Sequence, residues 1–259
     1  RRLKRLTLDQ LRSRKLPDVV ADLYALEELT ARAFEGGVSI KTLPKNIGRL
    51  KNLRRLDLSY SSISSLPAGF FELEQLEYLA LNSTSVADFL AQTNPESWAQ
   101  LKNLNSLELQ ENGLRRVGDW FSKMPRLRSL DLSVNAITSV GELPRKLTSL
   151  DLSMNQLREM PSCVFRLKDL EQLVLSCNQI GEVSDGVAAL TNLTNLVLDD
   201  NRIRLLSHQI SKVSRLEELS LSENKLTELP EGLDQLLKLR NLELSFNQIE
   251  RIPEGLVRL

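Results

Sequence analysis

Leucine recurs along this chain at regular intervals, in the pattern LxxLxLxxN, where x is any residue. Two copies stand close together in the stretch LRSLDLSVNAITSVGELPRKLTSLDLSMNQL, which spans residues 127–157. The same pattern covers the whole sequence, in eleven units that begin at Leu3, Leu26, Leu53, Leu76, Leu104, Leu127, Leu147, Leu170, Leu193, Leu216 and Leu239. The spacings between these starts are 23, 27, 23, 28, 23, 20, 23, 23, 23 and 23 residues. A short unit repeated in this way predicts a solenoid, in which each unit packs against its neighbours.

The last but one unit, LEELSLSENKLTELPEGLDQLLK, shows what each repeat is expected to form. Leu219 and Leu221 alternate with Ser220, which predicts a short strand with leucines facing the core and serine facing outward. Pro230 favours the start of a helical or 3-10 stretch, from which Leu233 returns to the core. Stacked units place their strands side by side in a parallel sheet, about 4.8 Å apart. Because the helical backs are wider than the strands, we expect the sheet on a concave face and the helices on a convex face.

Seven of the units continue the strand with an asparagine, at Asn112, Asn135, Asn155, Asn178, Asn201, Asn224 and Asn247. Each amide is expected inside the coil, where it bonds backbone groups that would otherwise be buried without partners. The first four units carry Leu11, Phe34 or a neighbour, Ser61 and Thr84 at this position. The N-terminal third is therefore predicted to be less regular and to open first.

Two units are longer than the others because of insertions, AFEGGV at residues 33–38 and ADFLAQTNPESWAQ at residues 87–100. Extra residues in a solenoid are expected to leave the coil as loops or longer helices. Asn94 followed by Pro95 predicts a helix start, and Trp98 is expected to pack inward. A protruding contact loop and a tolerated decoration are both consistent with the second insertion.

Charge and cysteine content narrow the range of partners and compartments. The 34 basic residues balance the 34 acidic residues, which removes the bulk electrostatic reason to expect nucleic acid or anionic membrane as partner. The two cysteines, Cys163 and Cys177, cannot form a disulfide framework or a cysteine metal site. We therefore expect a reducing compartment, the cytoplasm. No apolar run approaches the length of a membrane span, which is about 18 residues or more.

The sequence offers little for catalysis, so we expect neither an enzyme nor a bound cofactor or metal. His208 is the single histidine, which excludes a Ser-His-Asp triad and a histidine metal site. Glu108, Asp131 and Asp151 hold the same strand position in three consecutive units and form a predicted column of carboxylates. Such neighbours share a proton or bind a cation in some proteins, whereas a solvated acidic strip that selects basic partners is the simpler interpretation.

The extended unit LxxLxLxxNxLxxLP, with Ile or Met in place of some of its leucines, occurs at residues 53–67, 147–161, 216–230 and 239–253, and Ser61 replaces the asparagine in the first of these. These units resemble the intracellular 23-residue class of leucine-rich repeat proteins, which includes Ras-pathway scaffolds, Roco-type proteins and many bacterial repeat proteins. The resemblance implies an α/β solenoid, a curved horseshoe with a parallel sheet on its concave face and short helices or 3-10 turns on its convex face. It also implies protein binding. We expect one leucine-rich repeat domain over residues 1–259, within a longer protein that has flanking domains.

The stretch VGELPRKL at residues 140–147 belongs to the shortest unit and resembles the repeats of bacterial effectors whose repeat arm precedes a ubiquitin-ligase domain. An alternative function is therefore the substrate-recognition arm of a larger enzyme, an effector ubiquitin ligase or a protein with a linked GTPase or kinase. Its catalytic domain would lie outside this chain, and an effector would act in a host cytosol. An extracellular receptor is disfavoured, because paired cysteine caps are missing.

The leading prediction is a non-catalytic scaffold, a signalling protein that binds a partner protein on its concave face. Charge is polarised there, with Arg5, Arg32 and Arg55 at the N-terminal end and acidic residues, including Glu243, at the C-terminal end. The predicted contact residues are Tyr60, Glu108, Asp131, Val134, Asp151, Met154, Val174, Cys177, Val197, Asp199, Asp200, Glu218, Glu223 and Phe246. Their pattern indicates a partner with an apolar centre and basic flanks, with Tyr60 and Phe246 as anchors. Scattered exposed apolar residues that need no partner are the alternative.

Overall fold

The computed structural model describes residues 2–33 and 39–258. The predicted insertion at residues 33–38 therefore lies outside the described residues, apart from Ala33. The chain forms two compact units, one of residues 1–114 with 118–132 and one of residues 115–117 with 133–259. The single domain expected from the repeat pattern stays a prediction.

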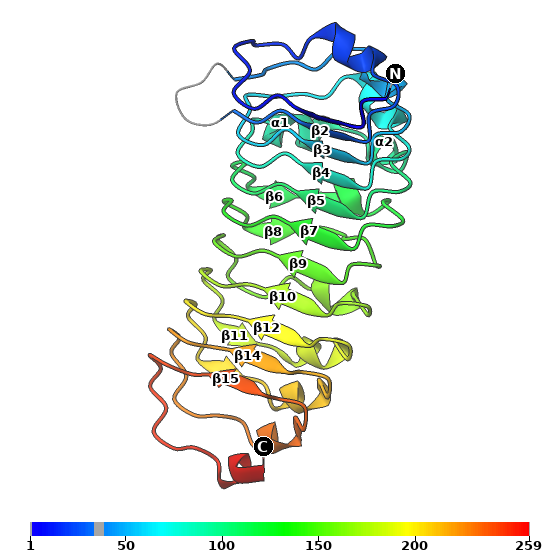
Figure 1. Cartoon of the computed structure of the whole chain (residues 1–259). Coiled ribbons are helices and arrows are strands. Elements are labelled where there is room, and N and C mark those ends of the chain that lie inside the picture. The colour runs from blue at the N-terminus through cyan, green and yellow to red at the C-terminus, as the bar shows by residue number, and fades with distance from the viewer. Residues whose placement is uncertain (1, 34–38, 259) are drawn as a thin grey trace. The chain divides into compact units, whose positions relative to one another are not determined.

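Among its described residues, the first unit contains six short parallel strands in chain order. They are β1 (Arg5–Thr7), β2 (Glu28–Thr30), β3 (Arg55–Asp57), β4 (Tyr78–Ala80), β5 (Ser106–Glu108) and β7 (Ser129–Asp131). Between them lie η1 (Asp18–Asp22), η2 (Ile47–Arg49), η3 (Ala68–Glu72), α1 (Ala87–Gln92), α2 (Pro95–Trp98) and η4 (Asp119–Phe121), where η marks a 3-10 helix. Figure 1 shows β2, β3, β4 and β5 one after another, each on its own turn of the ribbon. The repeat pattern therefore predicted one strand per turn correctly.

The part of the second unit that the structure describes repeats the arrangement with five parallel strands. They are β9 (Ser149–Asp151), β10 (Gln172–Val174), β12 (Asn195–Val197), β14 (Glu218–Ser220) and β15 (Asn241–Glu243), as Figure 1 shows. The connecting turns carry η5 (Val164–Arg166), η6 (Asp185–Ala189), η7 (His208–Lys212), η8 (Leu233–Gln235) and η9 (Glu254–Arg258). They also carry two small parallel pairs, β6 (Arg116–Val117) with β8 (Ser139–Val140) and β11 (Glu182–Val183) with β13 (Leu205–Leu206).

Leucines build the core of each turn and set the register of the strands. Leu196 of β12 stands opposite Leu219 of β14, and Leu219 opposite Leu242 of β15, so the middle leucine of each strand aligns with the next. Leu219, Leu221 and Leu233 are buried, as predicted. Ser220, between the two leucines, is buried as well, and its Oγ donates to Asp199 Oδ1 at 2.5 Å. Burial of the leucines at about 1.5–3 kcal/mol per side chain is what holds the turns together.

The asparagines form a ladder between neighbouring repeats, which confirms their predicted role. In the second unit, Asn178 Nδ2 donates to the carbonyl oxygens of Leu152 and Leu175 at 2.9 and 3.0 Å, and its Oδ1 accepts from the Leu157 N–H at 3.0 Å. In the first unit, Thr84 replaces asparagine and its Oγ1 donates to the Leu81 carbonyl at 3.0 Å. Ser61 is buried and its Oγ has no partner among the described residues. That the N-terminal third opens first stays a prediction.

The insertion at residues 87–100 folds into the first unit as α1 and α2. Asn94 caps α2, because its Oδ1 accepts from the Glu96 N–H at 3.0 Å, and Pro95 begins that helix. Trp98 is fully buried, with its ring centroid 5.5 Å from that of Phe71 and 5.6 Å from that of Phe121. The predicted helix start and the inward tryptophan are both confirmed. Within the described residues, no helix is both long enough and apolar enough to span a membrane.

Candidate protein-binding face

The predicted contact residues share a small set of places in the repeat. We number the LxxLxLxxN unit from position 1 to position 9 and call the side chains at positions 3, 5, 7 and 8 the sheet face. All fourteen predicted residues belong to it. Tyr60, Glu108 and Asp131 lie in the first unit, and the other eleven lie in the second.

Position 8 has an unusual backbone that the sequence does not reveal. Among the described residues, φ at this position is positive, between 50° and 60°, at Gln10, Tyr60, Ser83, Glu111, Val134, Met154, Cys177, Asp200, Glu223 and Phe246. This left-handed conformation costs roughly 1–2 kcal/mol for residues other than glycine, and for a β-branched residue such as Val134 it is rare. The residue at position 8 also takes part in the hydrogen bonding between repeats. The Met154 N–H, for example, donates to the Ser176 carbonyl of the next repeat at 2.8 Å.

The apolar residues of the second unit belong to two rows of the sheet face, position 5 and position 8, and in the position-8 row Asp200 and Glu223 separate Phe246 from Cys177. At position 5, Val174 of β10 stands opposite Asp151 of β9 and Val197 of β12. At position 8, Met154 is 52% exposed, Cys177 is also exposed, and Phe246 is 81% exposed. Val134, Val174 and Val197 are half-buried. The structure therefore brings the predicted apolar residues of this unit onto one face, with the bulkiest side chains at position 8.

The acidic residues of the second unit lie on the same face, at Asp199, Asp200, Glu218, Glu223 and Glu243. Asp199 Oδ1 accepts from Ser220 Oγ at 2.5 Å and from the Ser222 N–H at 2.8 Å. Glu218 Oε2 accepts from Asn195 Nδ2 at 2.5 Å. None of the five carboxylates forms an ion pair with another described residue. This part of the face therefore carries negative charge that the described chain leaves uncompensated.

The carboxylates also affect the exposed thiol between them. Partial burial of Cys177 raises the pKa of its thiol, and a hydrogen bond to Asp200 raises it further. The negative charges of Asp200, Glu223 and Asp199 act in the same direction. Cys177 is therefore a protonated, weakly reactive thiol at neutral pH.

In the first unit, the three arginines expected to form a cationic end are each engaged within the chain. Arg5 pairs with Glu28 at 3.3 Å. Arg32 pairs with Asp9 at 2.8 Å, and this bond lowers the pKa of the Asp9 carboxyl. The guanidinium of Arg55 lies 3.9 Å from the centroid of the Tyr78 ring. Within the first unit, the chain itself therefore supplies an interaction for each of these three cations.

The predicted carboxylate column is held by hydrogen bonds. Glu108 stands opposite Asp131 in the strand register of the first unit. Its Oε1 accepts from the Tyr78 hydroxyl at 2.9 Å and its Oε2 from Asn82 Nδ2 at 2.8 Å. Asp151, in the second unit, accepts from Ser153 Oγ at 2.6 Å and from the Ser153 N–H at 2.8 Å. These bonds satisfy the carboxylates as acceptors, which is the behaviour of a structural acidic strip.

Cys163 and the single histidine, His208, are not part of the sheet face. Cys163 is buried, and burial raises the pKa of its thiol to about 11. His208 begins η7 and is exposed, 2.9 Å from Gln209 Nε2 through its own Nε2. Among the described residues, no group of three His, Cys, Asp or Glu side chains is placed to hold a metal ion.

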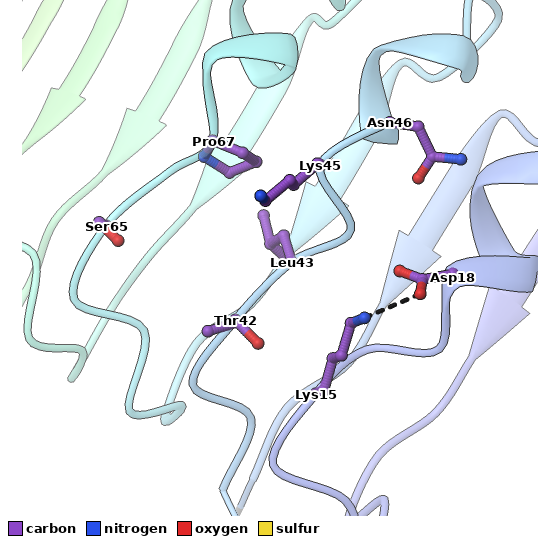
Figure 2. Close-up of a pocket in the computed structure, with 8 residues that line it drawn as sticks. All are labelled: Lys15, Asp18, Thr42, Leu43, Lys45, Asn46, Ser65 and Pro67. Carbon is purple, nitrogen blue, oxygen red and sulfur yellow. Dashed lines mark hydrogen bonds and ion pairs between the residues drawn. The ribbon is translucent and has the colours of Figure 1, made fainter.

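A cavity of about 730 Å³ in the first unit is also separate from the sheet face. Figure 2 shows its lining of Lys15, Asp18, Thr42, Leu43, Lys45, Asn46, Ser65 and Pro67, all from segments that connect the strands. Lys15 Nζ lies 2.8 Å from Asp18 Oδ2, as the dashed line in Figure 2 marks. None of these residues was predicted to contact a partner.

Comparison with known families agrees with this architecture. The model of the leucine rich repeat family matches residues 88–137, 145–203 and 191–249, and a second leucine rich repeat model matches residues 52–73. The chain belongs to the leucine-rich repeat family. Leucine-rich repeat domains are commonly protein-interaction modules and generally not catalytic. No curated protein matches the sequence.

Solved leucine-rich repeat structures resemble the chain over most of its length. A leucine-rich repeat protein of Leptospira interrogans is 29% identical, with a TM-score of 0.84, over 98% of this chain and 69% of that one. An internalin, inlF, of Listeria monocytogenes is 23% identical, with a TM-score of 0.67, over 99% of this chain and 84% of that one. The Toll–Spatzle complex of Drosophila contains a chain that is 20% identical, with a TM-score of 0.66, over 94% of this chain and 41% of that one.

Proposed function

We propose that this chain is a non-catalytic recognition module that binds a partner protein on its sheet face. The partner contributes an apolar centre that covers the two apolar rows of the second unit. It also contributes basic flanks that meet the carboxylates beside those rows. The general role is supported by family membership, because leucine-rich repeat domains are commonly protein-interaction modules. The Toll–Spatzle complex of Drosophila, a molecular hub, contains one chain of similar fold.

The observation that carries this proposal is the set of exposed apolar side chains at position 8 of the second unit. Met154, Cys177 and Phe246 are exposed apolar residues with φ of 53°, 55° and 56°, a conformation that favours glycine or asparagine. Stability alone favours replacing such residues, because each gives up roughly 1–2 kcal/mol of backbone energy and remains in water. The same backbone occurs at position 8 of other repeats, where it serves the fold, so it is the exposed apolar side chain at this position that requires an explanation. A partner that buries these side chains explains why they stand there.

The second support is the uncompensated charge of the same surface. Asp199, Glu218 and Glu223 lie beside the apolar rows and have no cationic partner among the described residues. Charges arranged in this way raise the rate of association with an oppositely charged partner and exclude like-charged competitors. A protein with basic residues around an apolar patch fits this requirement.

For the setting, we propose a signalling scaffold in the cytoplasm, supported by the two free thiols at Cys163 and Cys177. The same face serves equally well in the recognition arm of a larger enzyme. The sequence that flanks this chain in the full-length protein distinguishes these two functions, because only the second requires a catalytic domain.

The test is affinity capture from the cognate lysate followed by mass spectrometry. The wild type is compared with Met154→Glu/Val174→Glu, which places two charges in the apolar rows. The matched control is Leu205→Glu/Leu237→Glu, which alters exposed apolar residues outside the sheet face, 55% and 80% exposed. Circular dichroism checks that both variants are folded. A protein retained by the control and lost from the first variant supports the proposal, and a protein retained by both places the binding site elsewhere.

A further inference from the structure

One end of the sheet face combines an exposed aromatic ring with carboxylates. Phe246 and Glu223 occupy position 8 in neighbouring repeats, and the Glu223 N–H donates to the Ser245 carbonyl at 2.8 Å. The two side chains line a shallow cavity of about 470 Å³. Glu243 precedes Phe246 by three residues on the same face, and Asp200 is the next member of the position-8 row. An open ring beside several carboxylates is therefore the local chemistry of this surface.

The first unit shows how the chain itself uses the same chemistry. On three adjacent strands, the Arg55 guanidinium lies 3.9 Å from the centroid of the Tyr78 ring, and the Tyr78 hydroxyl donates to Glu108 Oε1 at 2.9 Å. Cation, ring and carboxylate are all supplied by the chain in that unit. At Glu223 and Phe246 the ring and the carboxylate are present, but neither forms an ion pair or a cation contact with another described residue.

We infer that the surface formed by Glu223 and Phe246 binds an arginine side chain of the partner. This inference rests on the proposed function, since it assigns one subsite of the same face. The guanidinium stacks on the Phe246 ring and its N–H groups donate to the Glu223 carboxylate. Glu243 and Asp200 add negative charge beside it.

Two physical properties favour arginine over lysine at this subsite. A guanidinium is planar and stacks on an aromatic face, while its fork of N–H donors matches a carboxylate. An ammonium group is a compact, strongly hydrated charge, so it loses more hydration when it approaches the ring. A neutral side chain of the same shape lacks the attraction to both groups.

The test uses the intact chain and three short peptides, acetyl-Gly-Arg-Gly-amide and its counterparts with lysine or citrulline at the centre. Citrulline keeps the shape of arginine without its charge. Each peptide is titrated into labelled protein, and NMR shifts of the Phe246 ring and the Glu223 amide report binding at this place. The arginine peptide is expected to bind in the millimolar range, about threefold tighter than the lysine peptide. Citrulline is expected to produce no saturable shift.

Two variants and a control test whether the peptide binds at this subsite. Phe246→Leu keeps an apolar side chain without the ring, and Glu223→Gln keeps the shape without the charge. Each is expected to lower the affinity for the arginine peptide by about threefold to fivefold. Tyr60→Leu, which removes an exposed aromatic from position 8 of the first unit, is expected to leave the affinity unchanged.

Three results would overturn the subsite. They are equal binding of citrulline and arginine, unchanged affinity in Phe246→Leu, or shifts spread over acidic residues elsewhere, such as Glu159. None of them touches the capture experiment with Met154→Glu/Val174→Glu. The arginine subsite and the protein-binding function can therefore fail separately.

Discussion

Asn178 ties its own repeat to the one before it, because its Nδ2 donates to the Leu152 carbonyl at 2.9 Å while its Oδ1 accepts from the Leu157 N–H at 3.0 Å. Both partners are buried, so no water replaces the amide when it is removed. A side chain that satisfies backbone groups on two turns at once makes the stacking of turns cooperative.

Replacement of Asn178 by alanine is therefore expected to lower the free energy of unfolding by about 2–4 kcal/mol, because it leaves several buried backbone groups unpaired. Urea denaturation followed by circular dichroism measures this loss. The control is Asn192→Ala, whose exposed Nδ2 donates to the Lys168 carbonyl at 2.8 Å. Its cost is expected to stay below about 1 kcal/mol. Equal losses in the two variants would contradict the role of the ladder.

A second prediction concerns the strain at position 8. Val134 has φ of 54°, so Val134→Gly is expected to relieve roughly 1–2 kcal/mol of backbone energy against a glycine entropy cost of about 0.5–1 kcal/mol. The net effect is a gain in stability of about 0.5–1 kcal/mol. Val174→Gly, on the extended backbone of β10, is the control and is expected to lose about 1 kcal/mol. Thermal unfolding distinguishes them, and a loss in both variants would show that position 8 is not strained.

The third prediction uses the pair formed by Asp9 and Arg32, whose side chains are 23% and 37% exposed. The hydrogen bond from Arg32 lowers the pKa of Asp9 below its ordinary value of 3.8. A carboxyl whose pKa falls on folding contributes stability above its unfolded pKa and loses it as pH falls through the folded pKa. Asp9→Asn is therefore expected to cost about 1 kcal/mol at pH 7, and this cost is expected to shrink as the pH falls below about 3.9 and to vanish once the folded-state carboxyl is protonated.

Measurement of unfolding free energy for wild type and Asp9→Asn between pH 2 and pH 7, values that bracket the carboxyl pKa of about 3.9 in unfolded chains, tests this dependence. Asp18→Asn provides the comparison, because its carboxylate pairs with Lys15 at 2.8 Å in a more exposed place. It is expected to change stability by less than about 0.5 kcal/mol at every pH. A constant difference between Asp9→Asn and wild type across the range would refute the assignment.

The fourth prediction concerns the electrostatic half of the proposed function. Asp199→Lys/Glu218→Lys reverses two uncompensated charges on the sheet face. It is expected to lower the affinity for the captured partner by about tenfold at low salt. The dependence of its affinity on salt should become shallower as well. Glu182→Lys/Glu231→Lys makes the same change in net charge outside the face and is expected to stay within about twofold of wild type. Surface plasmon resonance at several salt concentrations measures the affinity of both double variants. Equal losses of affinity in the two would contradict the electrostatic part of the proposal.

Much of the fold was predictable because one physical rule repeats along the chain. The two strand leucines of each repeat, such as Leu219 and Leu221, must be buried, so the leucine spacing alone predicts where the strands and the turns lie. The asparagine at position 9 was predictable for the same reason, since Asn178 has to satisfy buried carbonyls in any such stack. Asn94 and Pro95 indicate the start of a helix, and the inward position of Trp98 was predicted from that helix.

The details of the face were less accessible, because they depend on contacts between repeats. Arg32 appeared to be a free cation, yet it pairs with Asp9, which stands 23 residues earlier at the same repeat position. Residues one period apart are neighbours in a solenoid, so a comparison at that spacing would have found this pair. The left-handed backbone of Val134 had no such signal, because glycine, asparagine and aspartate are the residues that mark it.

A final prediction tests the acidic surroundings of the exposed thiol. Burial and the hydrogen bond to Asp200 raise the pKa of Cys177, so little thiolate is present at pH 8. Alkylation by iodoacetamide, followed by peptide mass spectrometry, is expected to be slower at Cys177 in folded protein than in urea. Asp200→Asn removes the nearest negative charge and should speed this reaction by about threefold, whereas Glu182→Gln on β11 should not alter it. If Asp200→Asn reacted no faster, the carboxylates would not surround the thiol in solution as the position-8 row requires.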